Sequence, residues 1–310
     1  MRTDTKHAGN KSNSYVVAYL FIGVAAAIAG FLPWLVTGMR LSLQNLWATS
    51  TPPGQMPISL LPFSQYMLTL IAGLIITGSA IAGGILRLRR SRLPRFGATA
   101  AVIGLLGVQL AATLQASLTV SAGLLDNQAA ELYLSALLAG TIASIMVGVL
   151  VLFLISRAPA SGAVIGASFA AVALAPWLRA LLIPLNDVTT SPNSFTLGLI
   201  HWFPAVVVGL AIAWSVSMST ARLLAAGFSL IVLWFGPALF AAISIAAGSR
   251  VLAYQPAEMA KLGASSFLNF IDYRSGSLAP LVVAAAIATA GSICRSLFKK
   301  FNRSSSVSPA

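Results

Sequence analysis

The chain has 310 residues, of which 58% are hydrophobic and 8% charged, and its mean hydropathy is +0.89. Soluble domains carry about 25% charged residues, so this composition excludes an ordinary water-soluble domain and indicates a single bundle embedded in lipid. The net charge of +13 does not indicate nucleic-acid binding, because the basic residues form short clusters beside apolar segments.

The N-terminal residues 1–14 are polar, and we expect them to form a disordered cytoplasmic segment. The first apolar run, Tyr15 to Val36, exceeds the roughly 7–15-residue apolar core of a signal peptide. We therefore interpret it as an uncleaved anchor that spans the membrane.

Seven more apolar segments of spanning length follow. They are Ser64–Leu86, Gly97–Val120, Glu131–Ile155, Ser161–Pro184, Ser194–Val216, Leu223–Ala247 and Ser277–Phe298. Segments of this length are helices, because a barrel strand needs only about 10 alternating residues. The sequence thus predicts an all-α integral membrane protein, with an eight-span domain over residues 15–298 and a cytoplasmic tail over 299–310.

The basic residues are distributed unevenly between the two sides of this map. If the N-terminus is cytoplasmic, the cytoplasmic pieces hold 14 of the 19 Lys and Arg residues and the external loops hold 4. Cytoplasmic segments of membrane proteins are enriched in Lys and Arg. We therefore expect both termini to be cytoplasmic, with the basic clusters next to anionic lipids.

A short motif recurs in three segments that run outward in this map. It reads Pro-Trp-Leu at 33–35 and 176–178, and Pro-Ala-Leu at 237–239. The offset of four segments between the first two copies fits two parallel halves of four helices. The alternative is that Pro and Trp are simply common in such helices and near membrane interfaces.

The chain lacks the common catalytic motifs. No P-loop, HExxH or GxSxG pattern occurs, and two His and one Cys do not supply the roughly three protein ligands of a catalytic zinc site within the membrane. No Asp or Glu lies well inside a predicted span, which argues against a proton-coupled pump. We expect a protein without enzymatic activity, metal or cofactor.

Arg179 is the only basic residue well inside a predicted span. A buried cation in lipid is costly, so it is a candidate ligand-binding residue. His201 lies at a similar depth in the next segment, and the two form a hairpin. Together they are candidates for an anion site in the outer leaflet. The alternative is that Arg179 reaches the headgroups or pairs with Asp187, while His201 bonds a neighbouring helix.

Other polar and small residues in the spans predict helix contacts. Gln109 and Thr113 lie one turn apart and are expected to bond neighbouring helices or, alternatively, to line a polar substrate path. Small residues four apart at 140–148 and 162–170 predict close packing within the chain, with an oligomer interface as the alternative.

The last external loop contains a further helix signal. Pro256 suits the first position of a helix. The apolar residues that then fall near one face are Met259, Leu262, Phe267, Phe270 and Ile271. We expect an amphipathic helix that rests on the outer leaflet. A partner-docking helix or a lid would have the same pattern.

Two functions remain open. The first is a non-enzymatic accessory or scaffold component of a cell-envelope process, with a possible membrane-protein partner. The composition suggests that the membrane is a bacterial plasma membrane. The alternative is a transporter or lipid-handling permease with an anion site formed by Arg179, His201 and Gln109. The second requires a central hydrated cavity bounded by these residues, and the first requires a filled core.

Overall fold

The computed structural model of the chain describes residues 4–42, 44, 46–183, 192–215, 219–249, 255–272, 274 and 276–304. Over these residues the regular structure is nine α-helices and three short 3-10 helices, without a β-strand. The α-helices are α1 (Asp4–Val36), α2 (Leu68–Leu88), α3 (Gly97–Ser121), α4 (Gln128–Ser156), α5 (Ala160–Leu182), α6 (Ser194–Trp214), α7 (Thr220–Gly248), α8 (Pro256–Ile271) and α9 (Ala279–Ser304). Of these nine, all but α8 are long and apolar enough to cross a membrane, which confirms the predicted set of eight.

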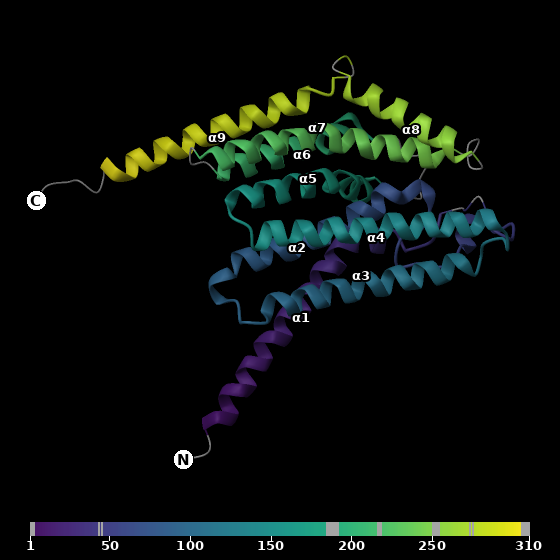
Figure 1. Cartoon of the computed structure of the whole chain (residues 1–310), viewed down its shortest axis with the longest axis horizontal. Coiled ribbons are helices and arrows are strands. Elements are labelled where there is room, and N and C mark those ends of the chain that lie inside the picture. Colours follow the sequence, from purple (N-terminus) through teal and green to yellow (C-terminus); the bar gives the residue numbers. More distant parts are fainter. Residues whose placement is uncertain are drawn as a thin grey trace, which may run out of the picture.

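The helices α2 to α7 lie side by side along the long axis of the molecule (Figure 1). Helix α3 forms one edge of this row, and α8 and α9 cover the opposite edge. α1 begins and α9 ends toward the same end of the bundle, where α2 turns into α3. Arg87 at this end donates hydrogen bonds to the carbonyls of Ile155 and Ala158, at 2.7 and 3.1 Å. Because Arg157 and Arg222 also lie at helix ends here, we call it the basic end.

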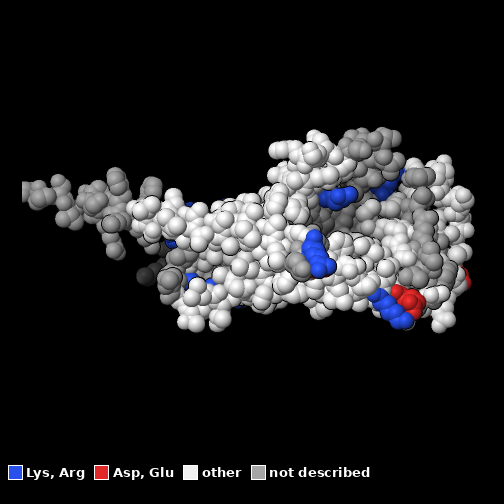
Figure 2. Space-filling view, turned by 90° about the horizontal axis from the view of Figure 1, so that it is seen from above, with Lys and Arg blue, Asp and Glu red and all other residues white. Residues whose placement is uncertain are grey.

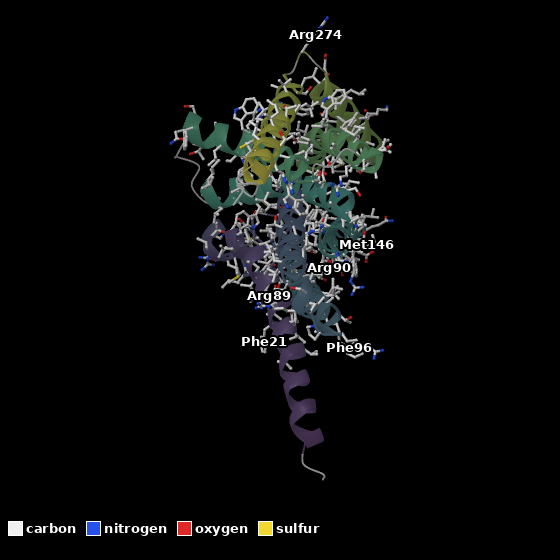
Figure 3. All side chains as sticks on the ribbon, turned by 90° about the vertical axis from the view of Figure 1, so that its left-hand side faces the viewer. Phe21, Arg89, Arg90, Phe96, Met146 and Arg274 are labelled. Atoms are coloured by element: carbon white, nitrogen blue, oxygen red, sulfur yellow. The ribbon has the colours of Figure 1, made fainter. Side chains whose placement is uncertain are left out.

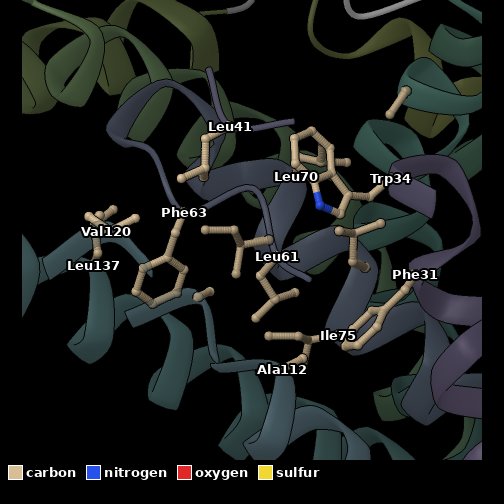
Figure 4. Close-up of a cluster of buried hydrophobic side chains, with 14 of the residues drawn as sticks. Phe31, Trp34, Leu41, Leu61, Phe63, Leu70, Ile75, Ala112, Val120 and Leu137 are labelled. Carbon is tan, nitrogen blue, oxygen red and sulfur yellow. The ribbon is translucent and has the colours of Figure 1, made fainter. Parts of the chain in front are cut away.

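The opposite end is closed by residues 37–67, which we call the cap. This segment has almost no helix, yet its Leu61 and Phe63 are fully buried. They pack with Trp34 of α1 and Ile75 of α2 in the largest hydrophobic cluster (Figure 4). The cap therefore extends the core beyond the helices, although its sequence indicates only a turn at 51–54.

Glycines allow the first helices to approach at backbone distance. A Cβ atom on Gly23 of α1 would lie 1.9 Å from the carbonyl oxygen of Ala101 in α3, and one on Gly104 would lie 2.2 Å from that of Leu20. Without a hydrophobic driving force between helices in lipid, such close packing is a main source of association. The pair α1 and α3 is therefore fixed by its glycines.

The chain termini differ from the sequence-based boundaries. The helix α1 begins at Asp4, within the stretch 1–14 that we expected to be disordered, and α9 continues to Ser304, into the predicted tail. Adding residues to an existing helix is much easier than starting one, so the apolar runs extend as helix into their polar flanks. The predicted end of the fifth span at Pro184 lies outside the described residues.

The last two helices also differ from expectation. The predicted helix at Pro256 is confirmed, but its half-buried residues face α7, where Phe267 stacks on Phe235 with ring centroids 5.9 Å apart. The link between α8 and α9 lies beside the middle of α7, and the indole nitrogen of Trp234 there is 3.3 Å from the hydroxyl of Ser277. The two helices together, rather than α9 alone, thus extend along the bundle (Figure 1).

Candidate functional site

Arg179 lies on the exposed side of α5, near the end that faces away from the basic end. The opposite side of this helix is anchored, since Ala180 is buried and the indole nitrogen of Trp177 donates to the carbonyl of Gly30 at 2.8 Å. The Arg179 guanidinium forms no hydrogen bond or ion pair with another described residue. Among the described residues, this cation is therefore exposed on an anchored helix, where it can meet lipid, water or a ligand. Its predicted partner Asp187 lies outside the described residues.

His201 is also exposed, on α6. Its ring meets the edge of the Trp202 ring, at a centroid distance of 4.7 Å and an angle of 83°. In the part of the chain that the structure describes, no hydrogen bond joins His201 to Arg179 or to a neighbouring helix. Both side chains thus belong to the surface of the α5–α6 hairpin, and their joint role stays a prediction.

The surface is hollowed on the side that carries α8 and α9. Figure 2 shows this hollow, with Lys or Arg side chains at it. A proline lies within each of the helices α5, α6 and α7, at Pro176, Pro204 and Pro237. Each one removes a hydrogen bond from the middle of its helix. This half of the molecule therefore combines a recessed surface with interrupted backbone hydrogen bonding.

Gln109 is enclosed elsewhere, between α2 and α3. Its exposed fraction is 0%, and its amide nitrogen donates to the carbonyl of Ile75 at 3.1 Å and to the hydroxyl of Ser79 at 3.3 Å. Its carbonyl oxygen has no partner among the described atoms. Because it is sealed inside the core, Gln109 does not share a surface with Arg179 and His201.

The predicted helix contacts are confirmed in part. Thr113 bonds the carbonyl of Gln109 in its own helix rather than a neighbour. Gly148 of α4 leaves room for the hydroxyl of Ser79 in α2, because a Cβ atom at position 148 would lie only 2.6 Å from that hydroxyl. Gly166 of α5 packs on Ile155. The small-residue motifs therefore serve packing within the chain.

A polar network that sequence reasoning missed ties the cap to α4. The hydroxyl of Tyr133 donates a hydrogen bond to the side-chain oxygen of Gln44. The same hydroxyl accepts one from the backbone nitrogen of Gln65, at 3.2 Å. The amide nitrogen of Gln44 donates to the carbonyl of Phe63 at 3.1 Å. The signal was a tyrosine within an apolar run, but its partners lie 89 and 68 residues away in sequence.

No group of three or more His, Cys, Asp or Glu suited to a metal occurs among the described residues. The eight long apolar helices define the class as a multi-pass membrane protein. Comparison of the chain with protein families, curated proteins and solved structures gives no match. Its function must therefore be argued from the chain's own residues.

Proposed function

We propose that the chain is a non-enzymatic accessory or scaffold protein of the cell envelope, a bundle in a bacterial plasma membrane with both termini cytoplasmic. The observation that carries this proposal is the filled centre of α1 to α4. Gln109, the polar residue most suited to a substrate path there, is fully enclosed and bonded to α2. A transporter needs a route for its substrate through the core. A scaffold instead needs a core that is packed and rigid.

The surface of α9 supports a membrane-protein partner. Only 6% of its apolar window is buried, against 61% for the window that includes α2. Small exposed residues such as Ala286 and Ala290 allow a foreign helix to approach closely. A helix of a partner protein would supply this contact.

Cysteine accessibility tests the sealed core. In a Cys294→Ser background, we expect Ser79→Cys, which changes one atom beside Gln109, to resist a small charged thiol reagent added from either side. Gln55→Cys in the exposed part of the cap should react readily. Rapid labelling at Ser79→Cys would reveal a water path and reject the scaffold proposal.

Photo-crosslinking tests the partner. A photoreactive residue at Thr289, on the exposed face of α9, should crosslink to a protein, and one at Leu118 on α3 should crosslink to lipid alone. Lipid adducts alone at both positions would count against a partner on α9. A crosslinked dimer of this chain would identify the partner as a second copy of the chain rather than a different protein.

The alternative is a transporter or lipid-handling permease with an anion site in the outer leaflet. The exposed Arg179 and the hollow with basic side chains in Figure 2 favour it. In that case the ligand meets the α5–α9 half, outside the core around Gln109. Function should then require Arg179, and Arg179→Lys should retain only part of it, because Lys lacks the planar fork that grips two oxygens.

A further inference from the structure

A pocket of about 240 Å³ opens at the basic end, where the turn between α2 and α3 meets the end of α4. Three apolar residues, a serine and two arginines line it, namely Leu86, Arg90, Leu93, Ala98, Ser156 and Arg157, and its surface is mostly apolar. Pockets for drug-sized ligands measure about 300–1,000 Å³. This one therefore suits a small polar group with a short apolar extension.

The walls of this pocket are held in place by the fold. Leu86, Ala98 and Ser156 are at most 6% exposed, so the floor belongs to the core. Arg87, next to the pocket, links α2 to the end of α4 through its bonds to Ile155 and Ala158. The pocket thus has a fixed shape in the described structure.

The two arginines of the pocket keep their hydrogen-bonding capacity. Arg157 lies over the Phe153 ring, 5.8 Å from its centroid, and neither Arg157 nor Arg90 has a hydrogen bond or ion pair from its side chain to another described residue. Each guanidinium carries five N–H donors in a planar fork that matches phosphate oxygens.

The surroundings of the pocket supply further positive charge. Arg89, Arg92 and Arg95 lie in the same turn, and no described side chain at this end is a carboxylate. The ion pair between Lys261 and Glu258 lies on α8, away from this end. Figure 3 looks onto the basic end, with Arg89, Arg90 and the exposed Phe96 labelled on it.

The geometry points to a binding site for the phosphate headgroup of an anionic phospholipid. Arg90 and Arg157 bind the phosphate oxygens, while Leu86, Leu93 and Ala98 contact the glycerol and the first acyl carbons. Lipid is the source favoured over free phosphate because the pocket lies at the ends of helices suited to a bilayer and its floor is mostly apolar. Basic pockets between membrane helices bind such headgroups.

The test is lipid binding by the full chain in neutral detergent, counted by native mass spectrometry during titration with dioleoylphosphatidylglycerol. Neutral detergent has no anionic surface, so only an arginine that contacts the bound headgroup should contribute strongly, and we expect roughly fivefold in affinity from each one. The double variant Arg90→Gln/Arg157→Gln should therefore bind about twentyfold more weakly. The matched control Arg89→Gln/Arg92→Gln removes the same charge from the same turn outside the pocket, and should lose about twofold.

A third variant tests the cavity itself. Ala98→Leu leaves every charge in place and fills the pocket, so it should also weaken phosphatidylglycerol binding. Equal losses in the pocket and control pairs, or undiminished binding by Ala98→Leu, would overturn the site. Displacement of the lipid by an equal concentration of inorganic phosphate would overturn the lipid assignment and identify a free anion instead.

Discussion

The two halves of the molecule are built differently. In α1 to α4, helices meet through glycines at backbone distance, and the cap is joined to α3 and α4 by side-chain hydrogen bonds. In the second half the buried share of the apolar window is 44% in α5, 22% in both α6 and α7, and 6% in α9, whereas the four windows of the first half are 28% to 61% buried. The first half is held mainly by contacts within itself, and the second leaves a larger share of its apolar surface for other molecules.

This difference shows which half decides stability and which is available for binding. Helices in lipid associate through packing and hydrogen bonds, because lipid is as apolar as their side chains. The first half has both kinds of contact, while Gln65, Thr77 and Gln109 each keep one buried polar atom without a partner among the described atoms. The second half has a proline within each of α5, α6 and α7, against Pro33 alone within the helices of the first half, and its last two helices are separated by a non-helical link. Substitutions should therefore affect the two halves unequally.

The largest effect is expected for Gly104→Ala. Its new methyl group would meet the carbonyl of Leu20 at 2.2 Å, a backbone atom that cannot move without shifting α1. Overpacking of this kind destabilises by about 1–3 kcal/mol or more. Thermal unfolding of the purified protein measures it. The control is Gly107→Ala on the same helix, which meets nothing within 4 Å and should gain up to about 1 kcal/mol from helix propensity.

Tyr133→Phe should have the next largest effect. It removes one hydroxyl and leaves the buried oxygen of Gln44 and the backbone of Gln65 without that partner. An unsatisfied buried polar group costs about 1–3 kcal/mol. Thermal unfolding and proteolysis of the cap should both show the loss. A variant as stable as the parent would mean that the network does not hold the cap.

Gly209→Ala tests the second half with the same chemistry. The methyl group would meet the carbonyl of Ala284 and the side chain of Ile287, both at 2.8 Å. Because α9 packs mainly on α6 and is little constrained by other helices, it can shift slightly along α6, and we expect a loss below about 1 kcal/mol, under the usual overpacking range. Gly198→Ala in the same helix meets nothing within 4 Å and is the control. A loss equal to that of Gly104→Ala would remove the distinction between the halves.

The sequence predicted the regular features and missed the irregular ones. Helix number and approximate limits followed from long apolar runs, since lipid requires about 20 such residues per span. The buried cap did not follow, because Leu61 and Phe63 form no periodic pattern and their partners are distant in sequence. Arg179 was recognised from its charge alone. Gln109 was grouped with it by polarity, but the helices pack it away from Arg179, and only tertiary structure could show this.

The pocket at the basic end illustrates the same limit. The cluster of arginines at 87–95 is evident in the sequence and predicts contact with anionic lipid. The cavity also needs Ser156 and Arg157, which lie more than 60 positions later and reach the cluster only because α4 ends beside α2. A cluster of charges is visible in a short stretch of sequence, whereas the shape of the pocket that it lines depends on how the helices pack.

The smallest effect on stability is expected for Arg179→Leu. A cation costs about 2.5–3.5 kcal/mol at the centre of a bilayer and less near its surface, and Arg179 has no hydrogen bond or ion pair to another described residue to offset that cost. The thermal midpoint should therefore stay unchanged or rise. Arg40→Leu is the matched control, because the Arg40 guanidinium donates to the carbonyl of Met56 at 3.2 Å and its loss should lower the midpoint. If Arg179→Leu lowers the midpoint as much as Arg40→Leu does, the guanidinium has a structural partner. If short-chain phosphatidylglycerol stabilises the parent but not Arg179→Leu, the second half binds an anion and the transporter alternative gains over the scaffold.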